Sequence, residues 1–163
     1  MRRNGLFAIA ALLALLATSE LALSLPLRGI GPDLAILVVT AYAFGERPRT
    51  AAMAGFAVGL LRDLLLSTPV GLSAFAYAIV SYVVALLGVP RGVGPVVGTL
   101  AGATFASQVI YGVGVVFLGP LFDAGPLPRM LVITTVYNTV LAPVLIPLLS
   151  RIVRAEAAEV GAE

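Results

Sequence analysis

The sequence predicts an all-α integral membrane protein with about six short transmembrane helices in one bundle. Hydrophobic residues make up 60% of the 163 residues and charged residues only 11%. A soluble domain of this size has too little interior to bury so much apolar surface. The apolar residues form long runs that suit the hydrocarbon core of a bilayer. Short segments with proline, glycine and charge separate the runs, so each run predicts one helix.

The predicted spans form a single transmembrane domain. We expect them at about residues 5–25, 33–45, 50–66, 72–88, 96–118 and 130–149, with a charged cytoplasmic tail at 151–163. The second and third spans are short, but one continuous helix would place Glu46, Arg47 and Arg49 at mid-membrane, at a cost of several kcal/mol. Two short spans with local thinning of the bilayer are therefore expected.

The first apolar run has two interpretations. It approaches the length of about 20 residues that crosses a bilayer. Arg2 and Arg3 before an apolar stretch, with Ala17-Thr18-Ser19 ahead of a cut, are also typical of a signal peptide. Because the apolar residues continue to Leu25, we favour a retained span.

Arginine counting predicts that both ends of the chain are cytoplasmic. With the N-terminus inside, the inside receives Arg2, Arg3, Arg47, Arg49, Arg91, Arg151 and Arg154. The outside receives Arg28 and Arg129, and Arg62 lies within a span. Cytoplasmic loops carry the excess of positive charge in membrane proteins, so this orientation is the expected one.

Two rows of small residues predict close contact between helices. The row in the third span consists of Ala51, Gly55 and Gly59, and its next step is Asp63. The row in the fifth span consists of Gly94, Gly98, Gly102 and Ala106. Such rows let backbones approach closely in lipid. Polar residues within spans, including Gln108, Thr134 and Asn138, are expected to bond neighbouring helices or their own backbone.

Several charged residues are predicted to lie near the outer side of the membrane. Glu20, Arg62 and Asp63 fall within spans, within about 8 Å of the outer boundary at the rise of an α-helix. Asp33 begins the second span on the same side and is predicted to be its N-cap. Asp63 continues a small-residue row, so it is expected to point into protein. Arg62 is predicted to pair with a carboxylate from another helix, with Glu20 as the candidate.

No group of residues in the sequence suggests catalysis. The chain has no cysteine and no histidine, which removes thiol nucleophiles, the usual zinc ligands and the commonest general base. It also has no glycine-rich phosphate loop and no aspartate-rich metal motif. We therefore expect no enzyme activity, no catalytic residues, no metal and no cofactor. No basic stripe with interleaved aromatics is present, so nucleic acid is not an expected partner.

Part of the chain, about Gly31–Leu87, carries a recognisable pattern. Pro32-Asp33-Leu34 opens a short apolar helix that ends in a basic turn. Gly55 and Gly59 then precede Arg62-Asp63-Leu64, Pro69-Val70-Gly71 and a helix rich in small residues. This order of glycines, aspartate and Pro-x-Gly resembles the rod shape-determining protein MreD family.

The resemblance implies a non-enzymatic scaffold of the cell-elongation machinery in the bacterial inner membrane, with a role in organising peptidoglycan synthesis. Members of the family associate with MreC, and through it with MreB, RodA and a class B penicillin-binding protein. The resemblance also implies a fold similar to the substrate-binding subunit of energy-coupling-factor vitamin transporters. A substrate-capture subunit is therefore the alternative function, although the short outer loops favour the scaffold.

The expected partner-binding residues lie at the outer end of the third span and in the turn after it. They are Gly55, Gly59, Arg62, Asp63, Pro69 and Gly71, whereas Asp33 and Glu20 are expected to be structural polar residues. The neighbour of Asp63 stays open at this point. It is either the single membrane helix of MreC or another helix of this chain, such as the first or fourth.

Overall fold

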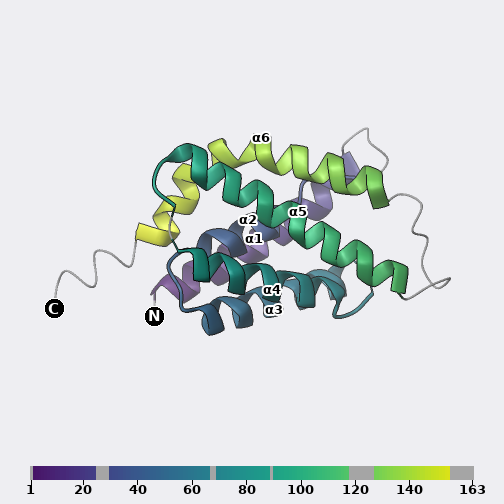
Figure 1. The fold of residues 1–163 in the computed structure, drawn as a ribbon, viewed down its shortest axis with the longest axis horizontal. Coiled ribbons are helices and arrows are strands. Elements are labelled where there is room, and N and C mark those ends of the chain that lie inside the picture. Colours follow the sequence, from purple (N-terminus) through teal and green to yellow (C-terminus); the bar gives the residue numbers. More distant parts are fainter. Residues whose placement is uncertain (1, 25–29, 67–68, 89, 118–126, 155–163) are drawn as a thin grey trace.

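The computed structural model describes residues 2–24, 30–66, 69–88, 90–117 and 127–154, and these residues form six α-helices and no strand. The helices are α1 (Arg2–Ser24), α2 (Leu34–Ala43), α3 (Pro48–Leu65), α4 (Leu72–Leu87), α5 (Val93–Phe117) and α6 (Leu127–Arg154). All six follow the long axis of one bundle, and α1 begins at the end of the bundle where α6 finishes (Figure 1).

The all-helical prediction is confirmed, and each helix overlaps one predicted span. The ends differ in places: α5 begins at Val93 and α6 continues to Arg154, into the predicted tail. Among the described residues, α5 and the Leu127–Val144 part of α6 are long and apolar enough to cross a membrane. Shorter apolar helices cover Asn4–Thr18, Leu34–Ala43 and Leu72–Leu87. The fold is therefore consistent with a membrane protein.

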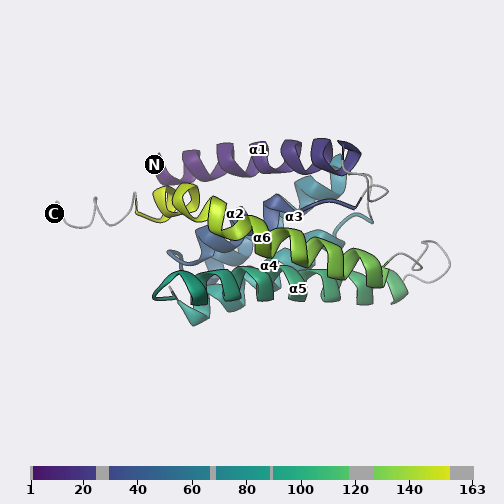
Figure 2. The ribbon, with the colours of Figure 1, turned by 90° about the horizontal axis from the view of Figure 1, so that it is seen from above.

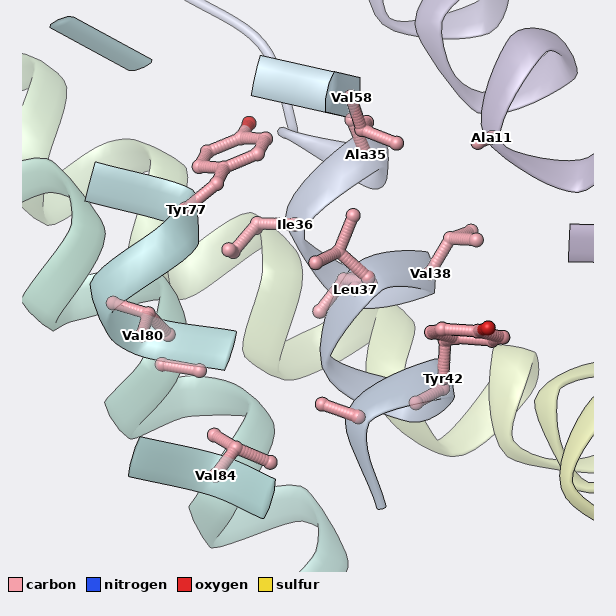
Figure 3. Close-up of a cluster of buried hydrophobic side chains, with 14 of the residues drawn as sticks. Ala11, Ala35, Ile36, Leu37, Val38, Tyr42, Val58, Tyr77, Val80 and Val84 are labelled. Carbon is pink, nitrogen blue, oxygen red and sulfur yellow. The ribbon is translucent and has the colours of Figure 1, made fainter. Parts of the chain in front are cut away.

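The short helix α2 forms the centre of the bundle. Nine of its ten residues, Ala35 to Ala43, are buried, and it contacts all five other helices. Its sequence is apolar on every side, as expected of a helix surrounded by protein. Figure 3 shows Ile36 and Leu37 of α2 among side chains of α3 and α4. On the side of α1, the ring of Tyr42 stacks on Phe7 with centroids 4.1 Å apart.

The helices α3 and α4 form the most extensive pairwise contact in the bundle. The reason lies in the glycines of α3. A Cβ atom at Gly55 would lie 2.6 Å from the carbonyl oxygen of Tyr77, and one at Gly59 would lie 2.5 Å from that of Ser73. Only glycine lets the two backbones come this close.

The glycines of α5 have different surroundings. A Cβ atom at Gly94, Gly98 or Gly102 would have no described atom within 4 Å. Gly98 and Gly102 line a groove of about 380 Å³ between α5 and α4, whose other lining residues are apolar apart from Thr99. The three glycines of the α5 row are therefore not used for close contact within the described chain.

The segment before α2 enters the bundle as extended chain. Residues 30–33 have no regular structure, and Pro32 and Asp33 are buried. Figure 2 shows this segment running inward from the far end of α1 toward the start of α2. It carries Asp33 into the interior, where the polar residues of the other helices meet it.

Candidate functional site: a buried polar cluster at the start of α2

Polar side chains from all six helices, or from the residues that cap them, gather around the start of α2. We call this set the polar cluster: Thr18, Asp33, Arg62, Asp63, Ser73, Tyr77, Thr104, Ser107, Gln108, Tyr111, Thr134 and Asn138. All are buried except Tyr111, which is half-buried. Burial of so many polar groups is costly unless they bond one another, so their partners decide what the cluster does.

Asp33 caps α2, as predicted, and also binds two side chains. Its Oδ1 accepts a hydrogen bond from the backbone N–H of Ile36 at 3.4 Å. Its Oδ2 accepts one from the Tyr77 hydroxyl at 2.5 Å and lies 3.4 Å from Arg62 Nε. One carboxylate thus joins the start of α2 to α3 and α4.

Side chains of other helices bond the backbone around Asp33. The Asp33 N–H donates to Asn138 Oδ1 at 3.0 Å, and Asn138 Nδ2 donates to the Asp33 carbonyl at 2.8 Å. The Leu34 N–H donates to Thr18 Oγ1 at 3.2 Å, and Thr134 Oγ1 donates to the Gly31 carbonyl at 3.1 Å. Because extended chain inside a bundle lacks its own ladder of hydrogen bonds, these side chains supply the partners.

Arg62 pairs with a carboxylate from another part of the chain, but the carboxylate is not the one that the sequence suggested. Its Nη1 donates to Ser73 Oγ at 2.7 Å, its Nε faces Asp33, and its Cζ lies 5.9 Å from the Tyr111 ring centroid. Glu20, the predicted partner, is exposed on α1. The prediction of Glu20 was wrong because the inward course of residues 30–33 brings Asp33 to Arg62.

Asp63 points into protein, as predicted, and caps α4. It is fully buried, and its Oδ2 accepts from the backbone N–H of Gly71 at 2.9 Å, of Ser73 at 3.0 Å and of Ala74 at 3.4 Å. The N-cap residue of α4 is Gly71, which has no side chain to offer, so α3 provides the acceptor. Of the two alternatives left open for the neighbour of Asp63, the structure shows the fourth helix of the same chain.

The other predicted partner-binding residues also make contacts within the chain. Gly55 and Gly59 face α4, as described above. Gly71 has φ +96°, which favours glycine, and the Pro69 carbonyl accepts from the Leu72 N–H at 3.2 Å. These residues shape the turn and its packing. Their contact with a partner protein stays a prediction.

The polar cluster encloses very little space. A cavity of about 10 Å³ lies among Arg62, Tyr77, Ser107, Gln108 and Tyr111. Such a volume is about that of one water molecule. Among the described residues, no group of three or more His, Cys, Asp or Glu side chains is placed to hold a metal ion. The polar cluster therefore joins the helices, and the cavity that its described residues enclose is too small for a ligand larger than water.

A comparison of the sequence with models of protein families identifies the family of this chain. The model of the rod shape-determining protein MreD matches residues 1–154. The chain belongs to the MreD family. The match covers all six helices, whereas the sequence pattern alone covered about Gly31–Leu87. No curated protein and no solved structure matches the chain. Membership in the MreD family implies a role in determining rod shape, and the resemblance to a vitamin-capture fold stays a prediction.

Sequence reasoning missed Tyr77 and Thr104 as members of the cluster. Asn138 was noted only as a polar residue within a span, yet it binds Asp33 and also donates to Thr104 Oγ1 at 3.1 Å. A buried amide or phenol in an otherwise apolar span is the available signal. That signal does not name the partner, because the partner lies on extended chain that has no periodicity.

Proposed function

We propose that this MreD-family chain is a non-enzymatic membrane scaffold of the rod-shape machinery, which binds MreC and helps organise peptidoglycan synthesis. The family match supports the cell-shape role. The main support for a scaffold is that the charged side chains of the polar cluster are bonded within the chain. Asp33, Arg62 and Asp63 are buried and bonded within the chain, and the cavity beside Asp33 and Arg62 has a volume of only about 10 Å³.

We propose that the chain crosses the bacterial inner membrane several times, with both ends in the cytoplasm. The described arginines Arg47, Arg49 and Arg91 are exposed. Arg47 and Arg91 lie in the α2–α3 and α4–α5 connections and Arg49 lies in the first turn of α3, at the end of the bundle where α1 begins (Figure 1). Large apolar side chains such as Leu12 and Leu13 are more than half exposed on α1, which suits contact with lipid.

A substrate-capture subunit is the weaker reading. Small-molecule sites usually have volumes of about 300–1,000 Å³ with a few convergent polar groups. The polar cavity here is far smaller, and the larger grooves beside α5 are mainly apolar. The turn at Pro69–Gly71 remains a candidate contact with the partner, because Val70 is 69% exposed there.

The proposed function is tested by recovery of MreC. The tagged chain is purified after mild crosslinking of native membranes, and MreC is measured by quantitative mass spectrometry. We expect enrichment of MreC over a control membrane protein of similar abundance. Absence of that enrichment, with the chain folded and inserted, would overturn the proposal.

A further inference from the structure

The arginines at one end of the bundle have no partner of opposite charge. We call this end, where α1 begins, the inner end, because the proposed orientation places it in the cytoplasm. Arg47, Arg49 and Arg91 are exposed there, and within the described chain none of them forms an ion pair. Arg62, near the other end of α3, is by contrast buried and faces Asp33. The inner-end arginines are therefore available to a ligand from outside the chain.

These arginines are spread around the inner end. The helix α4 packs against both α3 and α5, so it lies between Arg47 and Arg49 on one side and Arg91 on the other (Figure 1). Within the described chain, Glu46 is the acidic residue of this end, and it is half-buried. A single acidic segment, whether residues 156–163 of this chain or part of another protein, would reach one side of the bundle. Lipid headgroups surround the whole end, so the spread of charge fits an anionic leaflet.

The helix α6 continues past the end of α2 on this side. Asn138 of α6 bonds the Asp33 backbone, and α2 ends at Ala43, ten residues after Asp33. Both helices rise by about 1.5 Å per residue, so the same distance along α6 from Asn138 leads to Leu148. The helix continues to Arg154. Its last turns therefore lie at or beyond the level of the connections that carry Arg47 and Arg91.

The end of α6 has an amphipathic sequence and leaves the line of the rest of the helix. Pro143 and Pro147 interrupt the backbone hydrogen bonds, and the last turns (yellow) bend at the inner end (Figure 1). At about 100° per residue, apolar residues share one side of the helix and polar residues share the other. The apolar residues are Leu148, Leu149, Ile152 and Val153, and the polar residues are Ser150, Arg151 and Arg154. This pattern is typical of a helix that lies in the membrane interface.

The type of basic residue also suits a phosphate ligand. All ten basic residues of the chain are arginine. The planar guanidinium group donates two parallel hydrogen bonds to phosphate oxygens, so it binds a phospholipid headgroup with defined geometry. Each arginine near an anionic membrane surface strengthens binding about fivefold. Several arginines around one end of the bundle therefore give a large preference for anionic lipid.

We propose that the inner end of the bundle binds anionic phospholipid headgroups of the cytoplasmic leaflet. Arg47, Arg49 and Arg91 bind headgroups around the bundle, and the amphipathic end of α6 lies in the membrane interface. This inference rests on the orientation given under the proposed function, which places the inner end in the cytoplasm. It adds the ligand of these arginines and the position of the last turns of α6.

The first test is lipid competition in native mass spectrometry of the purified full chain. The protein in detergent receives equal amounts of phosphatidylglycerol and phosphatidylcholine, which share the phosphate group but differ in net charge. We expect the wild type to retain phosphatidylglycerol preferentially, and Arg47→Gln, Arg49→Gln and Arg91→Gln each to lower that preference about fivefold. Arg129→Gln, at an exposed arginine of the opposite end, is the matched control and should change it little. No preference in the wild type, or an equal loss with Arg129→Gln, would overturn the proposal.

The second test locates the end of α6 with spin labels. The chain has no cysteine, so Ile152→Cys and Ser150→Cys each create one labelling site. In vesicles of equal parts phosphatidylcholine and phosphatidylglycerol, we expect the label at residue 152 to collide mainly with oxygen, which concentrates in lipid. The label at residue 150 should collide mainly with a water-soluble nickel complex. Access of the nickel complex to both labels, or of oxygen to neither, would contradict an interfacial helix.

The outcome for lipid binding is separable from the proposed function. MreC recovery measures the scaffold function, and reaction of an Arg91→Cys variant with a membrane-impermeant thiol reagent measures the orientation. Full MreC recovery from a wild-type chain that shows no lipid preference would refute the lipid site and leave the scaffold function standing. Reaction of the Arg91→Cys variant from the outside of intact cells would refute the cytoplasmic leaflet as the source of the lipid.

Discussion

The small-residue rows of α3 and α5 have the same four-residue spacing but different surroundings. In α3, Gly55 and Gly59 face the backbone of α4 so closely that a methyl group would overlap it. In α5, Gly98 and Gly102 have no described atom within 4 Å of a Cβ position. The spacing of small residues thus predicts that a helix can be approached closely, but it does not identify the neighbour.

The residues that continue each row explain the difference. A short turn leads from α3 to α4, and Asp63 at the end of the α3 row accepts three backbone hydrogen bonds from the start of α4. No carboxylate follows the α5 row, because its next four-residue steps are Ile110 and Gly114. A directional polar contact therefore fixes the α3 row against its neighbour and is missing from the α5 row.

The largest expected effect is that of a bulky residue in the α3 row. Gly55→Leu would drive a side chain into the Tyr77 carbonyl and Ser81 Oγ, both within 2.6 Å of its Cβ. We expect little folded monomer in size-exclusion chromatography of detergent extracts. Gly98→Leu in the α5 row is the matched control and should give near wild-type yield. Equal yields from the two variants would show that the rows do not differ.

A smaller but still large effect is expected when the buried ion pair loses its cation. Arg62→Leu leaves the Asp33 carboxylate buried without its cation and with the Tyr77 hydroxyl still donating to it, so we expect a loss of about 3–5 kcal/mol. Thermal melting of the purified protein measures it. Adding Asp33→Asn to the same chain should restore part of the loss, since the unpaired charge is then gone. A double variant less stable than Arg62→Leu would contradict the pairing.

Asp63→Asn is expected to have the next largest effect. The amide keeps one acceptor oxygen but turns an NH₂ group toward the N–H groups of Gly71 and Ser73, so a loss of about 1–3 kcal/mol is expected. The loss should appear in the purified chain without any partner protein. Leu64→Ala, at a neighbouring residue that is 61% exposed, is the control. If the variant has wild-type stability, the fold does not need the Asp63 carboxylate. The direct docking role predicted from the sequence would then be the better explanation for this residue.

Much of the fold was predictable because its helices are apolar runs separated by turn residues. The N-cap at Asp33 and the inward direction of Asp63 also followed from local pattern and helical periodicity. The ion pair between Arg62 and Asp33 did not. Counting residues along helices treats the segment before α2 as a loop outside the bundle, whereas residues 30–33 run into it. The need of that extended backbone for Thr18, Thr134 and Asn138 is a tertiary effect without a sequence periodicity.

The most direct test compares one added methyl group in each row. Gly59→Ala and Gly102→Ala are purified without partners, and their melting temperatures are measured in the same detergent. A Cβ atom at residue 59 would lie 2.5 Å from the Ser73 carbonyl oxygen, so we expect that variant to lose about 1–3 kcal/mol. Gly102→Ala should match or slightly exceed the wild type, because alanine favours the helix and meets no described atom within 4 Å. Equal destabilisation by both substitutions would contradict the assignment of the α3 row to the fold and of the α5 row to an open face.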